Sequence, residues 1–254
     1  MPSLLINFIK KCEEEYKEFM GIDTFPLYQI RQKEMTLDKT KTQGFDCIAA
    51  AFYDISTGTH TLEIWSKAFL PEMNSKYIVF HEFTHILDAN TYSDRDSKKH
   101  MSNKGFTEYH AAQIDFLTLL GAEKIMQESA FSFSMNQSFD TIEGKETAED
   151  FLKKPLVHAS NLISRDDFPA NIETLTTTLG LIFNYYGRRS ICKMYATDFN
   201  DNADKSGFID LLGTNIIKDL DDYMLGWFNS SRVAIIDKWY YERATFIAIQ
   251  NHLQ

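Results

Sequence analysis

The chain has 254 residues, of which 44% are hydrophobic and 14% aromatic, so it can bury a substantial core as one large domain or two small ones. A formal net charge of −10 and a pI near 5.2 argue against a nucleic-acid partner, because binding to phosphates requires a concentrated positive surface. No stretch approaches the about 18 consecutive apolar residues of a transmembrane helix, so no membrane partner is expected.

The N-terminal segment and the cysteines indicate where the protein works. Residues 1–19 have no basic residue before their short apolar run and no small-residue cleavage site after it, so they do not resemble a signal peptide. Their apolar residues recur at helical spacing, which predicts an amphipathic surface helix. Cys12, Cys47 and Cys192 are widely spaced, so neither a disulfide framework nor a cysteine-rich zinc site is predicted. We expect a cytoplasmic protein.

Residues 46–66 predict a β-hairpin. Apolar and polar residues alternate on both sides of a turn-rich centre, with Gly58 as the expected turn residue. We expect residues 60–66 to form the outer strand. Its unpaired backbone groups would then bind an extended substrate as an added strand.

Helical periodicity begins after the hairpin. Residues 70–90 switch to helical periodicity, with Asn74 or Ser75 available as the N-cap of the helix. The polar stretch at residues 91–105 is longer than the usual connection of about 4–6 residues, so it is expected to be a lid or, more commonly, a flexible loop. Residues 106–126 predict the next helix.

The rest of the chain, from Glu146 onward, predicts four or five more helices. Pro169 and Asn171 mark the start of one of them, and Gly187 marks its end. The weakest boundary lies at residues 129–147, where Ser, Asn, Gly and Asp cluster. We therefore expect an α+β protein with its chemistry in region 1–130 and a helical region at 131–254, unless the two form one continuous domain.

The segment HEFTH, residues 81–85, carries the chemistry. Helix positions i and i+4 lie about 40° apart around the axis, so His81 and His85 project together and can share one cation. Glu82 lies about 100° around from His81, beside the cation rather than among its ligands. That position suits a general base for a zinc-bound water. The alternative is a pair of solvated or packed histidines without a metal.

A catalytic zinc site needs a third protein ligand and one open position. The extended pattern H-E-x-x-H-x-x-G-x-x-H is excluded, because residues 88 and 91 are Asp and Thr. One stripe of the next helix consists of Glu108, Ala112, Asp115 and Leu119. The small side chains of Ala111 and Ala112 would let this helix approach the histidine helix, and Glu108 at its start is the predicted third ligand. His110 points about 200° away from Glu108, so it is expected to be packed or solvated.

HEFTH followed by EYHAAQIDFLTLL at residues 108–120 resembles the gluzincin group of zinc metallopeptidases and, more loosely, the ImmA/IrrE-type metallopeptidases. The similarity covers residues 45–125, about a third of the chain. It implies a zincin-like fold in which a small sheet or hairpin lies over the histidine helix, with zinc as the cofactor. It also implies His81, His85 and Glu108 as zinc ligands and Glu82 as the catalytic base.

The chain departs from this group four residues after Glu108, where many gluzincins carry an Asp that supports a ligand histidine and this chain has Ala112. Asp115 or Asp88 can supply that support; Asp88 is otherwise a metal neighbour or a solvated carboxylate at the helix end. The group also uses a Tyr or His to stabilise the oxyanion. The candidates for that role are Tyr109, Tyr185, Tyr186 and His158.

These observations predict a zinc-dependent metallopeptidase that hydrolyses peptide bonds in a peptide or protein substrate. Zinc polarises the scissile carbonyl and lowers the pKa of its water, while Glu82 takes the proton and returns it to the leaving amine. One alternative is a non-catalytic protein of zincin fold, in which zinc stabilises an interaction or regulatory module. A closed fourth coordination position would favour it. A different metal-dependent hydrolase is the other alternative.

Overall fold

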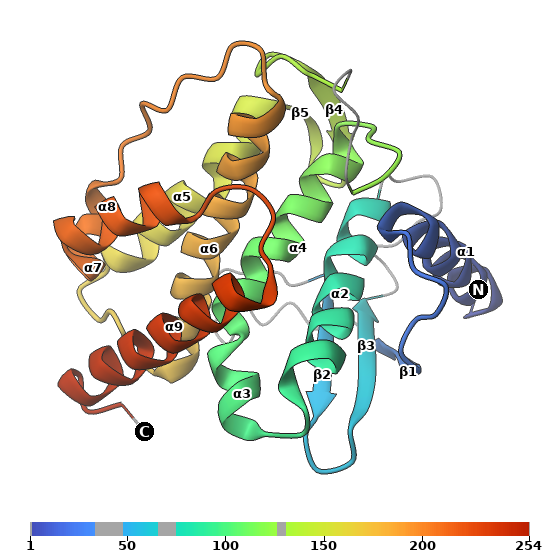
Figure 1. Ribbon diagram of the computed structural model, residues 1–254, viewed down its shortest axis with the longest axis horizontal. Helices are drawn as coiled ribbons and strands as arrows, with labels where there is room; N and C mark the ends of the chain where they lie inside the picture. Colours follow the sequence, from blue (N-terminus) through green and yellow to red (C-terminus); the bar gives the residue numbers. More distant parts are fainter. Residues whose placement is uncertain (1, 34–47, 66–74, 126–130, 254) are drawn as a thin grey trace.

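A computed structural model describes residues 2–33, 48–65, 75–125 and 131–253, which form a mixed α+β fold (Figure 1). The strands are β1 (Tyr28–Lys33), β2 (Ala49–Asp54), β3 (Thr59–Trp65), β4 (Ser138–Thr141) and β5 (Gly144–Thr147). The helices before residue 130 are α1 (Pro2–Met20), α2 (Lys76–Asp88), α3 (Ser97–Ser102) and α4 (Lys104–Leu119), and a π-helix, Ala89–Ser93, continues α2. The later helices are α5 (Ala148–Ile163), α6 (Ile172–Tyr195), α7 (Ser206–Leu212), α8 (Thr214–Tyr223) and α9 (Ser230–Gln250). The α+β class and the mostly helical C-terminal half are confirmed.

The first three strands form one sheet in the order β1-β3-β2. β2 and β3 make the predicted hairpin, and Gly58 in its turn has a φ of 71°, which favours glycine. Residues 46, 47 and 66 of that prediction lie outside the described residues. β1 pairs in parallel with the other side of β3. The prediction that residues 60–66 form an outer strand is therefore wrong: β3 is central, and β2 is an edge strand among the described residues.

Helix α2 lies against the sheet and against α1 (Figure 1). Its residues Val79, Phe80 and Phe83 are fully buried. The ring centroid of Tyr16, from α1, lies 5.2 Å from that of Phe80 and 5.5 Å from that of Phe83, both in edge contacts. The Tyr16 hydroxyl also lies 3.0 Å from Thr84 Oγ1. Packing on two sides thus fixes α2, and the amphipathic N-terminal helix is confirmed.

Residues 91–105, predicted as a lid or a flexible loop, are mostly helical. The π-helix extends α2, and α3 begins shortly after Asp94 and Arg95, whose φ values are 48° and 54°. The Asp96 side chain accepts a 2.9 Å hydrogen bond from the Lys99 N–H and so caps α3. The prediction of a flexible loop was wrong because the polar residues of this segment act as turn residues and helix caps, whereas a role as a lid stays a prediction.

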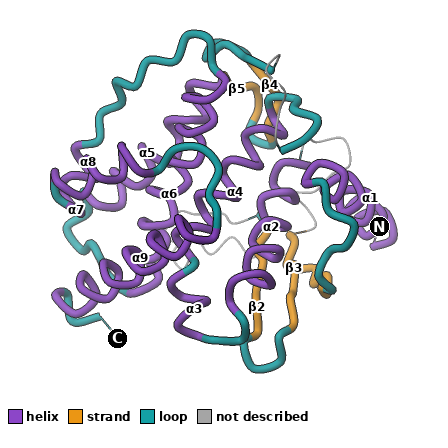
Figure 2. Tube along the Cα trace, viewed as in Figure 1, coloured by secondary structure: helices purple, strands orange, loops and turns teal. Residues whose placement is uncertain are grey.

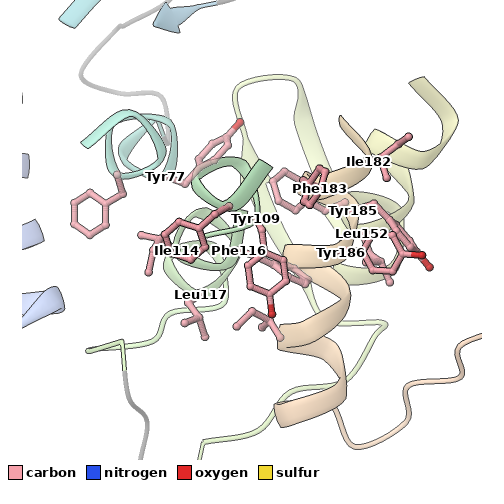
Figure 3. Packing of buried hydrophobic residues seen from close by; sticks show 14 of the residues in the cluster. Tyr77, Tyr109, Ile114, Phe116, Leu117, Leu152, Ile182, Phe183, Tyr185 and Tyr186 are labelled. Atoms are coloured by element: carbon pink, nitrogen blue, oxygen red, sulfur yellow. The ribbon is translucent and has the colours of Figure 1, made fainter. Parts of the chain in front are cut away.

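Helix α4 lies between α2 and α6, and its large side chains fill the space between them (Figure 3). Ile114 and Phe116 are fully buried there. The helix ends at Leu119 rather than at the predicted residue 126. Gly121 adopts a φ of 79° just beyond that end, a conformation that commonly terminates helices.

Helix α6 runs unbroken through Gly187, where the sequence predicted a helix end. A Cβ at Gly187 would lie 2.2 Å from the backbone oxygen of Tyr109 and 2.9 Å from the Cβ of Ala112. Gly187 therefore lets α6 approach the backbone of α4 closely, and Ala112 serves this contact with α6. Asn171 caps α6, as predicted, because it accepts a 2.8 Å hydrogen bond from the Thr174 N–H.

The predicted boundary at residues 129–147 contains the β4–β5 hairpin. Side chains from both sides of it share one hydrophobic cluster, in which the rings of Phe116 and Phe151 lie 5.6 Å apart. The division into regions 1–130 and 131–254 stays a prediction. Figure 2 shows the strands in two small groups beside the helices. Within the described part of the chain, no helix combines the length and apolar character needed to cross a bilayer.

Candidate metal centre and active site

Helix α2 presents His81 and His85 on one face, one turn apart. Their ring centroids lie 4.7 Å apart. The side chains are only 16% and 17% exposed, because the sheet and α4 enclose this face of the helix. The helical spacing therefore brings the two histidines together, as the sequence predicted.

Helix α4 places Glu108 opposite the two histidines. Glu108 Oε2 lies 3.8 Å from His81 Nε2 and 3.9 Å from His85 Nε2. Ligand atoms of the three residues all lie within 4.8 Å of one another, and no second group of this kind occurs among the residues that the structure describes. The structure thus brings together the three side chains that were predicted as metal ligands.

Asp115 supports His81 from the next turns of α4. Its Oδ2 lies 3.1 Å from His81 Nδ1, and Arg188 Nη2 donates a 3.0 Å hydrogen bond to the same oxygen. Arg188 is held in turn by a 2.8 Å hydrogen bond from its Nη1 to the backbone oxygen of Phe151. Because Nδ1 faces Asp115, Nε2 of His81 is left to face Glu108. Such an outer contact fixes both the tautomer and the orientation of a ligand histidine.

Asp88, the other predicted support, contacts His110 instead. Both Asp88 oxygens lie 3.1 Å from His110 Nδ1, and the His110 ring stacks on Phe106 with centroids 5.4 Å apart. His110 is therefore packed, as predicted. His85 is supported by Thr107, whose Oγ1 lies 2.9 Å from His85 Nδ1. Thr107 was not predicted as a support, although its place directly before Glu108 on the same helix was a usable signal.

The two histidines differ in their protonation. Burial lowers the pKa of His85 to about 4. Burial also lowers the pKa of His81, but the hydrogen bond and the charge of Asp115 outweigh it and raise the pKa to about 9. In the metal-free protein at neutral pH, His81 therefore carries a proton and His85 does not. A cation that binds here must displace that proton.

The three ligands fit zinc. Two imidazole nitrogens and one carboxylate oxygen form a ligand set that catalytic zinc sites use. Zinc–ligand distances of about 2.0–2.2 Å in tetrahedral geometry correspond to ligand atoms about 3.4 Å apart. The two separations from Glu108, 3.8 and 3.9 Å, exceed that value by about half an ångström, and the three ligand atoms all lie within 4.8 Å of one another.

Glu82 lies beside the metal ligands without joining them, in the position that the sequence predicted. Its Oε2 accepts a 2.7 Å hydrogen bond from the Ala51 N–H of β2. Burial is the main influence on this carboxyl; the charge of His81 opposes it, and the net effect raises the pKa of Glu82 to about 7. A carboxyl that exchanges a proton near neutral pH is suited to general acid–base catalysis.

These residues line a cleft of about 480 Å³. One wall is the edge strand β2, from Ala49 to Tyr53. The C-terminal half contributes the facing wall through Thr176, Thr177 and Gly180 of α6 and Tyr240 of α9. The helices beyond residue 130 therefore complete the cleft.

None of the four residues predicted to stabilise an oxyanion lines this cleft as the described residues define it: Tyr109, Tyr185, Tyr186 and His158. The Tyr109 hydroxyl donates a 2.7 Å hydrogen bond to the Gly226 backbone oxygen, and the Tyr186 hydroxyl donates one of 3.0 Å to Asp221. Tyr185 is fully buried, and His158 is exposed on α5. The prediction was wrong because these side chains face the core or a different surface of their helices.

Tyr240, which was not predicted, does line the cleft. Its ring packs so closely on α4 that a Cβ at Gly105 would lie 2.7 Å from Tyr240 Cδ2. Burial, and to a smaller extent the charge of nearby Glu108, raises the pKa of Tyr240 above its ordinary range. Because Tyr240 lines the cleft, its hydroxyl is the candidate donor to a substrate bound there. No local pattern in the sequence pointed to Tyr240, because α9 reaches the site only through the tertiary fold.

Comparison of the chain with protein-family models, with curated proteins and with solved structures finds no match. Its function must therefore be inferred from the chemistry of the cleft.

Proposed function

We propose that the protein is a zinc-dependent metallopeptidase that hydrolyses peptide bonds. The observation that supports this most is the convergence of His81, His85 and Glu108 beside a separate carboxyl group, Glu82, in an open cleft. A purely structural zinc site has four protein ligands and needs no base. Here three ligands meet, and a side of the site faces the cleft. The cytoplasmic location predicted from the sequence is part of the proposal.

Each residue of the site has a task in this reaction. A zinc ion held by the three ligands would supply the Lewis acidity that polarises a carbonyl group and lowers the pKa of water. Glu82 accepts a proton from the attacking water and transfers it to the leaving amine. The Tyr240 hydroxyl donates a hydrogen bond to the oxyanion that develops on the scissile carbonyl. Contacts with Asp115 and Thr107 fix the orientation of the His81 and His85 rings, respectively.

Strand β2 offers a backbone template for an extended substrate. The Ala51 N–H points away from β3, because it is bound to Glu82. Both backbone groups of a residue in an antiparallel strand point to the same side, and the side alternates along the strand. The Ala51 carbonyl and both backbone groups of Tyr53 therefore also point away from β3. A peptide added along this edge would pass directly beside Glu82.

The decisive test compares wild type with Glu82→Gln. Glutamine keeps the size of the side chain and can still accept the hydrogen bond from Ala51, but it cannot take up a proton. Zinc content and thermal stability should stay near wild type, while hydrolysis should fall by about 10²–10⁴-fold, the usual contribution of a positioned general base.

Because the substrate is unknown, cleavage is best mapped by mass spectrometry on a proteome-derived peptide pool, with both proteins side by side. Elemental analysis of protein purified without added metal should find one zinc per chain. If both proteins bind zinc and no cleavage site depends on Glu82, the peptidase proposal is wrong and the zinc-stabilised, non-catalytic alternative takes its place.

A further inference from the structure

One end of the cleft collects basic side chains from three separate elements. His60 lies on β3, His100 on α3 and Lys104 at the start of α4, and all three line the cleft. Tyr53 of β2 joins them, because its ring centroid lies 4.8 Å from that of His60 and 5.4 Å from that of His100. We call these four residues the basic corner.

The polar atoms of the basic corner are only partly satisfied by the protein. His60 is 2% exposed, and neither of its ring nitrogens makes a hydrogen bond of ordinary geometry to any residue that the structure describes. Burial lowers the pKa of His60, with the Asn90 side chain acting in the opposite direction. A buried imidazole without a firm partner costs free energy, unless a ligand supplies the missing contact. His100 Nδ1 lies 3.2 Å from Ser93 Oγ, which leaves its other nitrogen for a ligand.

The charge of the corner is also unbalanced. Lys104 forms no ion pair with any residue that the structure describes, although the chain has a net charge of −10. Burial, then the charges of Lys104 and His60, lower the pKa of His100, and no carboxylate acts against them. Among the described residues, the carboxylates that line the cleft are Glu82 and Glu108, which belong to the proposed metal centre. The corner therefore combines one unpaired cation with two neutral imidazoles that can donate hydrogen bonds.

We propose that the basic corner is a substrate subsite that binds a carboxylate group of the peptide. This inference rests on the proposed peptidase function and specifies its substrate class: peptides with Asp, Glu or a free C-terminus near the scissile bond. Lys104 supplies the charge, His60 and His100 supply hydrogen-bond donors, and Tyr53 holds the two imidazole rings in place.

The spacing of the elements limits where this carboxylate lies in the peptide. Lys104 precedes Glu108 by four residues on α4, which corresponds to about 6 Å along the helix axis. Tyr53 follows Ala51, the residue bonded to Glu82, by two residues on β2, which corresponds to about 7 Å. An extended peptide advances about 3.3 Å per residue. The carboxylate should therefore belong to a residue within about two positions of the scissile bond.

The first experiment measures cleavage preference with zinc-loaded protein. Sites cut in a proteome-derived peptide pool should be enriched in Asp or Glu at one such position. Synthetic peptides with Glu or Gln at that position, each with a free or amidated C-terminus, then separate a side-chain carboxylate from a terminal one. We expect kcat/KM to be about 10–100-fold higher for the acid than for its amide, the usual effect of a charged hydrogen bond.

Variants assign that preference to the corner. Lys104→Met should bring the ratio of kcat/KM for the acidic peptide to kcat/KM for the amide peptide close to one. Lys104→Arg should retain most of the preference. Lys99→Met is the matched control, because it removes the same charge from an exposed residue outside the cleft. If Lys104→Met does not fold, His100→Gln provides the same comparison.

A binding experiment keeps this inference separate from the peptidase proposal. Zinc-loaded protein is titrated with N-acetylglutamate methylamide or with its glutamine counterpart, while NMR follows the imidazole signals of His60 and His100. The acid should shift both signals, the amide should shift neither, and Lys104→Met should abolish the response. Cleavage without any acid preference, and without these shifts, would overturn the subsite and leave the peptidase standing. Shifts without any cleavage would support the subsite and count against the peptidase.

Discussion

Glu108 and Asp115 lie on one face of α4 and both act on His81, but from opposite sides of its ring. Glu108 faces Nε2, and Asp115 faces Nδ1. Glu108→Gln should therefore weaken zinc binding strongly, because it removes a ligand charge. Asp115→Asn removes only the outer support and should weaken binding by about 10–100-fold. Competition with a chromophoric chelator measures both affinities. Equal losses, or a loss in Asp115→Asn alone, would mean that the third ligand is misassigned.

The sequence predicted the site residues that depend on local geometry and missed those that depend on the tertiary fold. His81, Glu82 and His85 share one helix, so their spacing alone places them. Glu108 follows from a second helical stripe of small and acidic residues. Tyr240 is different, because only the crossing of α9 over α4 brings it to the cleft. Its ring can pack on α4 only because Gly105 has no side chain, and the pattern of a single helix does not reveal such a contact between two helices.

The close contact of α4 and α6 depends on glycine at position 187. Gly187→Ala would place a methyl group 2.2 Å from the Tyr109 backbone oxygen, so the helices must separate. We expect a destabilisation of about 1–3 kcal/mol, the usual cost of overpacking a core, measured by urea denaturation. Gly180→Ala on the same helix is the matched control. Its Cβ would meet the Glu108 side chain no closer than 3.4 Å, so stability should change little or increase. Equal losses in both variants would contradict this account.

Helix α9 carries a second testable feature, the half-buried carboxyl of Asp237, whose Oδ1 has no hydrogen-bond partner within the described part of the chain. Burial, with a smaller effect of the Asp88 charge, raises the pKa of Asp237 to about 7. The folded state therefore favours the protonated form. The stability associated with this group is present below about pH 4 and is lost as the pH rises through about 7.

Asp237→Asn should remove that loss. At pH 8 the variant should be more stable than wild type by about 1–3 kcal/mol, and at pH 4 the two should be nearly equal. Urea denaturation across this pH range checks the result, and Asp210→Asn, at an exposed position on α7, serves as the control. A variant that is less stable than wild type at pH 8 would show that the charged carboxylate has a partner in the fold.

The order of the strands shows why the sequence placed the substrate edge on the wrong strand. The alternation of residues 46–66 identifies the hairpin but does not say which strand lies outside. β1 decides that, because its parallel pairing with β3 joins segments that are distant in the chain. Strand β1 has only two large apolar residues, Tyr28 and Ile30, so its pattern was too short to recognise. The helices in the polar segment 91–105 were not predicted either, because its capping residues can be recognised as caps only once the position of α3 is known.

A zinc ion at the proposed centre would add a link between elements that packing and hydrogen bonds already join. Its ligands come from α2 and α4, and the cleft above them is closed by α6 and α9. A ligand that binds only the folded state stabilises it by RT ln(1 + [L]/Kd), or about 4 kcal/mol at a concentration 1,000 times Kd. For a chain of this size each kcal/mol corresponds to about 2–4 °C in Tm. Removal of zinc by a chelator should therefore lower Tm by about 8–16 °C under such conditions.

The loss of Tm on zinc removal should be larger at high pH than at low pH. The pKa of His81 in the metal-free fold is about 9, above the unfolded value of about 6.5. The stability that protonated His81 gives the metal-free protein is thus complete below about pH 6.5 and is lost as the pH rises through about 9. Zinc must also displace that proton, which weakens its binding by up to about tenfold for each pH unit below the pKa. Thermal scans with and without chelator should therefore differ more at pH 8.5 than at pH 6. Glu108→Gln should show a small difference at both pH values, whereas a zinc effect that is larger at pH 6 would mean that His81 is not a ligand.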